Sequence, residues 1–124
     1  MGRRTARGLS WDTVCALGEA FPGTERSTSY GTPALKVKGK LLARLKEDGE
    51  SMVLRMSFVV RDHLMMTEPA TFYITDHYRD YPSVLVRLEK ADHAVIGQLL
   101  EDAWRDAAPK TLVKSFDDSA RKER

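Results

Sequence analysis

The feature that most constrains the fold is a run of alternating apolar and polar residues between positions 35 and 58, interrupted twice by turns. Leu35 and Val37 begin the run, Gly39 marks the first turn, and an acidic turn follows at 47–50. A period of two residues is typical of strands with one buried and one exposed face. Short turns between such strands indicate antiparallel neighbours. The run therefore predicts three successive strands of an antiparallel sheet.

The same alternation predicts which side chains of the first two strands are buried. The residues expected in the core are Leu35, Val37, Leu41, Ala43 and Leu45. The basic residues between them, expected to be exposed together on the other face, are Lys36, Lys38, Lys40, Arg44 and Lys46. Arg55 is expected to join this face from the third strand. Segment 34–46 contains no acidic residue, although the formal net charge of the whole chain is only +2. Clustered basic charge attracts polyanions, so this face is a candidate surface for binding the phosphates of a nucleic-acid backbone. It can equally be a solvated sheet face whose lysines discourage edge-to-edge aggregation.

Helical periodicity appears on both sides of this run. Ser10 is suited to cap a helix that Pro22 and Gly23 end, and a second helical pattern extends from Asp92 to Pro109. The remaining predicted elements are a short strand at 27–30, a short helix at 61–68, strands at 71–75 and 84–88, and a loop at 76–82. This order predicts an α+β fold. We expect a two-layer sandwich in which the N- and C-terminal helices pack on one face of an antiparallel sheet.

Length and composition suggest a single domain at 9–114, with a flexible basic arm at 1–8 and a frayed polar tail at 115–124. Cys15 is the only cysteine, so no internal disulfide can form. No apolar stretch is long enough for a signal peptide or a membrane span. We therefore expect a cytoplasmic monomer that does not associate with membranes.

The loop at 77–81 is the second candidate site. It interleaves His77, Tyr78 and Tyr81 with Arg79. Such a loop can stack bases or hold a phosphate, and we assign Tyr78 and Arg79 to the nucleic-acid surface. It can equally be a structural turn in which Asp80 pairs with Arg79. An alternative pocket would be formed by Ser29, Tyr30, His77, Tyr81, Trp104, Arg105 and Lys110, although the apolar spacing of the C-terminal helix favours a core position for Trp104.

Catalytic and metal-binding patterns are not found in the sequence. The Gly-x-x-x-x-Gly-Lys spacing of a phosphate loop is missing from the segment around Gly31. His63, His77 and His93 do not have the spacing of metal ligands, and Cys15 is expected to be a buried, inert thiol. We therefore expect a binding protein with no cofactor, and not an enzyme.

Three segments together resemble the MmcQ/YjbR-like family of small bacterial proteins. They are Phe21-Pro22-Gly23-Thr24-Glu25 followed by residues 27–37, then residues 77–88, and finally Ala103-Trp104-Arg105 followed by residues 107–110. The resemblance covers residues 9–114. It implies a frataxin-like α+β sandwich and a role in DNA binding through a "double wing" surface. Iron binding is not implied, because the first helix offers only Asp12 and Glu19 as acids.

Two hypotheses of function follow. The first is a DNA-binding protein, of low sequence specificity, that uses the basic strands and the 77–81 loop. The second is a domain that binds a small anion or a protein partner in a pocket near Tyr30, His77 and Trp104. A strong dependence of affinity on salt concentration would separate the first from the second.

Overall fold

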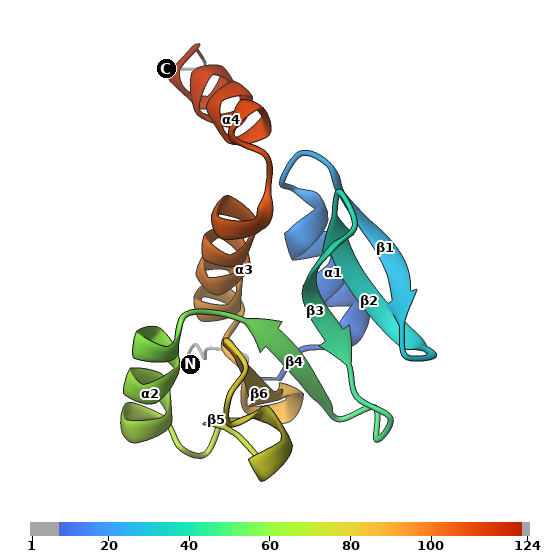
Figure 1. Ribbon diagram of the computed structural model, residues 1–124, viewed down its shortest axis with the longest axis vertical. Coiled ribbons are helices and arrows are strands. Elements are labelled where there is room, and N and C mark those ends of the chain that lie inside the picture. Colours follow the sequence, from blue (N-terminus) through green and yellow to red (C-terminus); the bar gives the residue numbers. More distant parts are fainter. Residues whose placement is uncertain (1–7, 123–124) are drawn as a thin grey trace, which may run out of the picture.

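Six antiparallel strands form one sheet, and helices cover one of its faces (Figure 1). The computed structural model describes residues 8–122. Its elements are α1 (Trp11–Glu19), β1 (Thr24–Ser29), β2 (Thr32–Val37), β3 (Lys40–Leu45), β4 (Ser51–Arg55), α2 (Phe58–Thr67), β5 (Phe72–Tyr73), the 3₁₀ turn η1 (Asp76–Tyr78), β6 (Ser83–Arg87), the 3₁₀ turn η2 (Leu88–Lys90), α3 (His93–Ala107) and α4 (Lys110–Lys122).

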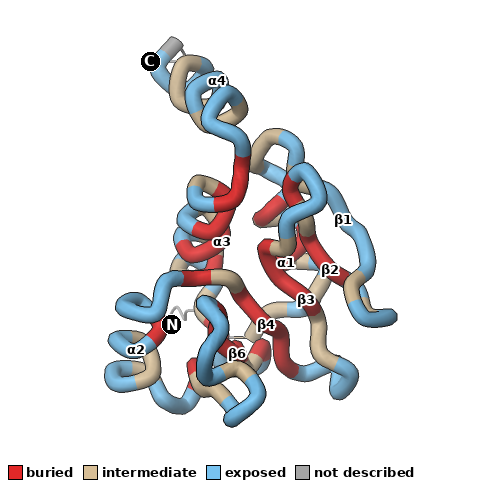
Figure 2. The backbone as a smooth tube through the Cα atoms, in the orientation of Figure 1, coloured by how far each residue is buried: buried red, intermediate tan, exposed pale blue. Residues whose placement is uncertain are grey.

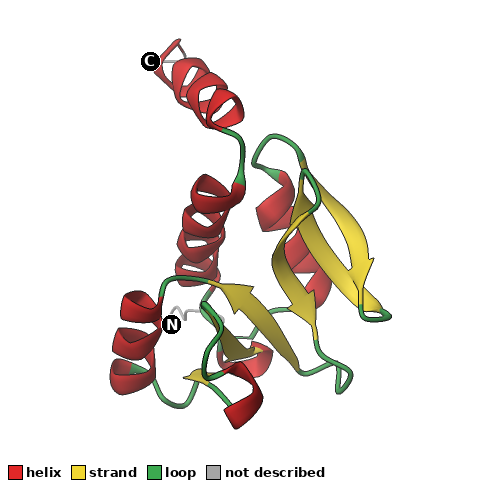
Figure 3. Cartoon of the chain, viewed as in Figure 1, coloured by secondary structure: helices red, strands yellow, loops and turns green. Residues whose placement is uncertain are grey.

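The strands lie in the order β1-β2-β3-β4-β6-β5 (Figure 3). The first four follow one another as a meander, which confirms the three predicted strands and the short strand expected near residues 27–30. β6 then pairs with β4 and places β5 at the far edge. This order brings the turns around residues 30 and 47 to one end of the sheet.

The hydrophobic core lies between the sheet and the helices α1 and α3 (Figure 2). α1 contacts β1 and α3, and α3 contacts β3 and β4. Leu35, Leu54 and Trp104 are among the side chains that the core buries completely. The two-layer α+β sandwich with its N- and C-terminal helices on one face is therefore confirmed.

Side-chain caps explain where the helices begin. Ser10 accepts a hydrogen bond from the backbone N–H of Thr13 at 3.1 Å, as its position predicts. Ser57 plays the same part for α2, accepting from Val60 N–H at 3.2 Å. The alternating pattern predicted a strand up to residue 58, and this was wrong, because the cap at Ser57 ends the extended chain. β4 stops at Arg55 instead, and α2 starts before the predicted residue 61.

The C-terminal segment also differs from the expected frayed tail. Residues 110–122 form α4, whose apolar side chains face the core. The Phe116 ring lies 5.2 Å from the Trp104 ring and 5.5 Å from the Phe21 ring, measured between centroids. Arg105 on α3 donates to Asp117 at 2.8 Å. These contacts hold a helix that otherwise projects beyond the sheet in Figure 1.

The N-terminal arm lies outside the described residues except for Gly8, whose N–H donates to the carbonyl of Ala91 at 2.9 Å. Among residues 8–122, none of the helices combines the length and the apolar character that a membrane crossing requires.

Candidate functional site: a basic, aromatic pocket on the open face of the sheet

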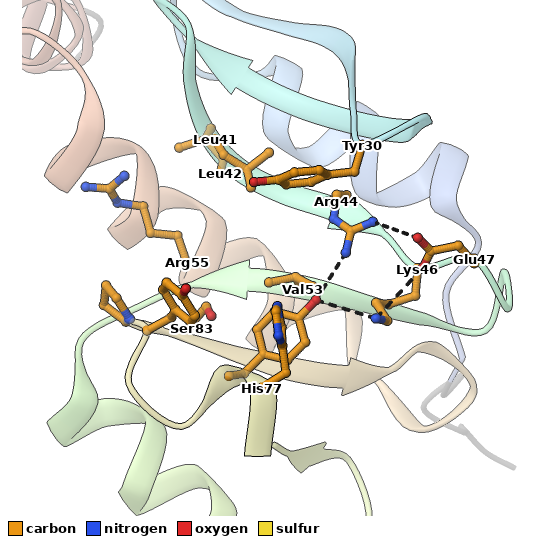
Figure 4. Close-up of a pocket in the computed structure, with 13 residues that line it drawn as sticks. Tyr30, Leu41, Leu42, Arg44, Lys46, Glu47, Val53, Arg55, His77 and Ser83 are labelled. Atoms are coloured by element: carbon orange, nitrogen blue, oxygen red, sulfur yellow. Dashed lines mark hydrogen bonds and ion pairs between the residues drawn. The ribbon is translucent and has the colours of Figure 1, made fainter. Parts of the chain in front are cut away.

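A cavity of about 650 Å³ lies on the face of the sheet away from α1 and α3 (Figure 4). Its floor is formed by β3, β4 and the start of β6. The β1–β2 turn closes one side and the segment from η1 to β6 closes the other. The residues that line it are Tyr30, Leu41, Leu42, Arg44, Lys46, Glu47, Val53, Arg55, His77, Tyr78, Tyr81, Pro82 and Ser83.

A bulge in β3 decides which of its side chains face the cavity. Ala34 pairs with Arg44, but Lys36 pairs with Leu41, so Leu42 is an additional residue on β3. Alternate residues of β2 share a face, and so do directly opposed residues of two strands. Leu41 and Arg44 therefore face the same side although they are three positions apart, which simple alternation does not allow.

Arg44 is the central cation of the pocket, and it is only 6% exposed. Its Nη1 donates to Thr32 Oγ1 at 2.9 Å and its Nη2 donates to the Tyr78 hydroxyl at 3.1 Å. The carboxylate of Glu47 lies 3.5 Å from Nη1. The guanidinium therefore joins the β1–β2 hairpin, β3 and η1 in one network.

Lys46 approaches the same tyrosine. Its Nζ donates to the Tyr78 hydroxyl at 3.4 Å and lies 5.3 Å from the centre of the Tyr78 ring. Because this hydroxyl accepts from both Lys46 and Arg44, its own proton remains available to a further acceptor. Two cations and one O–H donor thus converge at the floor of the pocket.

The electrostatic balance of the lining is positive. Three cations line the pocket, Arg44, Lys46 and Arg55, against the single carboxylate of Glu47, so their formal charges sum to +2. A backbone hydrogen bond, aided by the two nearby cations of β3, holds the pKa of Glu47 below its ordinary value. Glu47 is therefore ionised at neutral pH and offsets only part of the positive charge.

The segment after η1 is held by Arg61, a buried residue of α2. Its Nη1 donates to the carbonyls of Tyr78, Arg79 and Tyr81 at 3.3, 3.1 and 3.1 Å. Its Nε pairs with Asp62, and its guanidinium lies 4.8 Å from the centre of the Phe58 ring. Arg61 was not predicted from the sequence. The one signal available was a basic residue within an apolar stretch of α2.

Aromatic rings form the rim of the pocket. His77 lies 4.8 Å from Tyr78 and 5.9 Å from Tyr81, measured between ring centroids. Tyr30 enters from the β1–β2 turn, and Figure 4 shows it across the pocket from His77. Tyr30 and Tyr81 are 87% and 55% exposed, so the rim presents two rings that the fold itself does not cover.

The predicted nucleic-acid surface is only partly assembled. Arg44, Lys46, Arg55 and Tyr78 meet in the pocket, whereas Lys36, Lys38, Lys40 and Arg79 are not among the residues that line it. The prediction that the five basic residues of the first two strands share one exposed face was wrong. Arg44 is buried and Lys46 half-buried, and Lys38 occupies the β2–β3 turn at the other end of the hairpin. Lys40 pairs with the core residue Val37, because the bulge reverses the alternation between Lys40 and Arg44. Arg79 pairs with Asp76, and not with Asp80 as considered above.

The other buried positions of the hairpin also differ from the expected pattern. Leu41 and Leu45 are half-buried, whereas Leu42, expected to be exposed, is 1% exposed. The extra residue of the bulge accounts for Leu41 and Leu42.

Of the residues predicted for the alternative pocket, three line the cavity, namely Tyr30, His77 and Tyr81. Trp104 is not part of it, because this side chain is fully buried in the core, as its helical spacing predicts, and its Nε1 donates to the Pro22 carbonyl at 2.8 Å. Arg105 pairs with Glu101 and Asp117, which links α3 to α4. Ser29 and Lys110 also lie outside the set of lining residues.

Cys15 is completely buried in the core, as expected, and this burial raises the pKa of its thiol. In residues 8–122, His, Cys, Asp and Glu side chains do not gather in the groups of three that could hold a metal ion. The groups that line the pocket are mainly cationic, hydroxyl and aromatic.

Comparison with known proteins identifies the family. A family model described as YjbR matches residues 19–106. The uncharacterized proteins Rv2570 of Mycobacterium tuberculosis and Mb2600 of Mycobacterium bovis are each 39% identical to this chain over 122 residues, which is 86% of this chain and 95% of theirs. The crystal structure of Deinococcus radiodurans protein DR2400, with a domain described as DUF419, superimposes with a TM-score of 0.67 at 16% identity. That match covers 82% of this chain and 80% of the other, and it shows a shared fold. From its sequence match and its relatives, this chain belongs to the YjbR family.

Proposed function

We propose that this protein binds nucleic acid, and that a phosphate group of an unpaired nucleic-acid strand enters the pocket on the open face of the sheet. The observation that carries the proposal is the convergence of Arg44 and Lys46 on the Tyr78 hydroxyl. A guanidinium fork, an ammonium group and an O–H donor together match the several acceptor oxygens of a phosphate.

The contacts of these cations leave their charge available. Arg44 donates to two neutral hydroxyl groups, those of Thr32 and Tyr78. The one carboxylate among the described lining residues, Glu47, is 65% exposed and lies at the edge of the network. An exposed ion pair of this kind contributes little free energy, so an entering phosphate can compete for the guanidinium.

The shape of the site favours an unpaired strand over duplex DNA. The two cations of β3 are recessed below the rim, whereas duplex phosphates lie on the outside of a stiff double helix. The exposed lysines, Lys38 and Lys40, are near the β2–β3 turn, at the opposite end of the hairpin from Tyr30 and Lys46. Neither lysine lines the pocket, so we expect neither to contribute to a phosphate contact made inside it.

A free phosphate ester is the second candidate ligand. The observation in its favour is the concave shape of the site, since about 650 Å³ is a volume typical of small-molecule pockets. The same cations would hold the phosphate of a free ester or of a strand.

The test is a fluorescence anisotropy titration of a labelled single-stranded oligonucleotide at several salt concentrations, with duplex DNA, inorganic phosphate and a nucleoside monophosphate as competitors. If two cations meet phosphate, log affinity should fall with log salt with a slope of about −1.4. Lys46→Gln should reduce the magnitude of this slope by about 0.7. Lys40→Gln makes the same change of charge outside the pocket and should leave the slope unchanged.

Complete competition by the nucleoside monophosphate at similar concentration would identify a free ester as the ligand. No binding of the single strand at about 50 mM salt, where phosphate contacts are strong, would overturn the proposal of nucleic-acid binding. An equal loss of slope in Lys40→Gln and Lys46→Gln would overturn the assignment to the pocket.

A further inference from the structure

Tyr30 occupies a backbone conformation that a bulky residue rarely adopts. Ser29 pairs with Thr32, so Tyr30 and Gly31 form a two-residue hairpin turn. Their φ angles are +52° and +78°, which corresponds to a turn of type I′. Asn and Gly are preferred at its first position, because most other side chains are strained at positive φ.

Packing of the Tyr30 side chain within the fold does not offset this backbone strain. The Tyr30 side chain is 87% exposed, so almost all of its apolar surface remains in contact with water. Among residues 8–122, the group that lies over its ring is the Arg44 guanidinium, 5.5 Å from the ring centre. A strained backbone at an exposed aromatic residue is a pattern that points to function.

The ring lies over the pocket. Figure 4 shows Tyr30 on one side of the cavity and His77 on the other, with Arg44 and Val53 between them. Tyr81 contacts His77, so the side opposite Tyr30 also carries aromatic surface. The walls are therefore suited to a flat ring, while the phosphate-binding cations lie at the floor.

We propose that Tyr30 is the stacking residue for an unpaired nucleobase, so that the pocket takes one nucleotide unit with its base on Tyr30 and its phosphate at Arg44 and Lys46. This inference rests on the proposed function and adds the form of the ligand. A base between the two aromatic walls has both faces covered and cannot remain stacked in a duplex. The site therefore selects single strands, or bases that have left a helix.

The strained turn supplies a variant that removes the ring without harming the fold. Asn is well tolerated at positive φ, so Tyr30→Asn should melt at the same temperature as the wild type or higher. Lys38 provides the matched control, since Lys38 and Gly39 form a turn of the same kind, with φ angles of +49° and +83°. Lys38→Asn should have the same effect on melting but lies outside the pocket lining.

The experiment compares the binding of a labelled oligothymidylate, an abasic oligomer of the same length and a duplex to the full chain. The wild type should prefer the oligothymidylate to the abasic oligomer by about 10-fold, as expected for stacking of one base. Tyr30→Asn should bind both oligomers with equal affinity, whereas Tyr30→Phe and Lys38→Asn should keep the preference.

Equal binding of the two oligomers by the wild type would overturn the stacking role while leaving phosphate binding intact. So would a preference that survives in Tyr30→Asn, or a duplex bound as tightly as the single strand. If neither oligomer binds, the proposed function itself fails.

Discussion

At the scale of single residues, two buried arginines organise the candidate site in different ways. Arg44 faces the cavity and donates to side-chain hydroxyls, so a ligand can compete for it. Arg61 lies behind the 78–81 segment and donates to three of its backbone carbonyls. Carbonyls left without a donor are costly when buried, so Arg61 determines the conformation of the segment that carries Tyr78.

Arg61→Met should therefore loosen the segment and lower the free energy of unfolding by about 3 kcal/mol, since it removes a buried donor to several carbonyls. Urea denaturation measures the loss. Asp62→Asn is the control, because it removes only the exposed partner of Arg61 and should change stability little. Equal stability of Arg61→Met and the wild type would show that the segment does not depend on this residue.

At the scale of elements, the sequence predicts the type of most segments and misses features that depend on hydrogen bonds or on single residues. The period of two identifies the meander from β2 to β4 because one face of these strands is buried. It does not reveal the bulge at Leu42, since an apolar residue there fits either strand register. The helix cap at Ser57 was overlooked because Met56 and Phe58 continue the alternation.

The candidate site was predictable to a similar extent. The loop at 77–81 attracts attention by its composition, and the basic residues of β3 by their clustering. Their meeting with Tyr30 depends on strand order, which puts the β1–β2 turn opposite η1. For Trp104 the apolar spacing of α3 predicted the core position that the structure shows, and the pocket hypothesis did not hold for it.

The docking of α4 should be sensitive to acid. The hydrogen bond from Arg105 lowers the pKa of Asp117, with Arg121 adding to the effect. A carboxyl whose pKa is lowered by folding stabilises the folded state above its ordinary pKa, near 3.9, and loses this contribution as the pH falls through the folded value. Hydrogen-exchange protection of α4, relative to that of α3, should therefore decrease below about pH 4.

Asp117→Asn removes the ion pair that joins α4 to α3 and leaves the ion pairs within α4 in place. Those pairs involve Asp118, whose pKa is lowered by Lys114 and Arg121 of the same helix. This variant should show reduced protection of α4 already at neutral pH. If its protection matches that of the wild type throughout, the aromatic contacts of Phe116 hold the helix without help from the ion pair.

At the scale of the whole molecule, positive charge is divided between two places. Lys38 and Lys40 lie at the β2–β3 end of the sheet, outside the pocket, whereas Arg44 and Lys46 lie inside it, toward the β3–β4 turn. Acidic residues border the pocket cations, and Arg55 is paired with Asp106 on α3 at 2.9 Å. The attraction that the pocket exerts on an anion is therefore limited by a carboxylate on a different element.

Asp106→Asn should release Arg55 and tighten binding of a single-stranded oligonucleotide by about 2- to 5-fold, the range expected from breaking one partly exposed ion pair. Asp102→Asn is matched to it in charge. Asp102 and Asp106 both line a second cavity, which also contains Arg55. Asp102, however, accepts a hydrogen bond from Gln98 and is not paired with Arg55. Anisotropy titrations of both variants measure the effect, and an equal gain in the two would indicate a general change of net charge.

The bulge in β3 has a consequence for how relatives of this protein can be compared. Because of the one additional residue, odd-numbered positions before the bulge and even-numbered positions after it face the same side of the sheet. The face to which a basic residue of β3 points therefore depends on that insertion. A relative without the extra residue could carry an arginine in the aligned column and still direct it toward the helices. Residues of β3 in two relatives are therefore equivalent when they pair with the same residue of β2. The residue that pairs with Ala34 identifies the pocket cation more reliably than an aligned sequence position does.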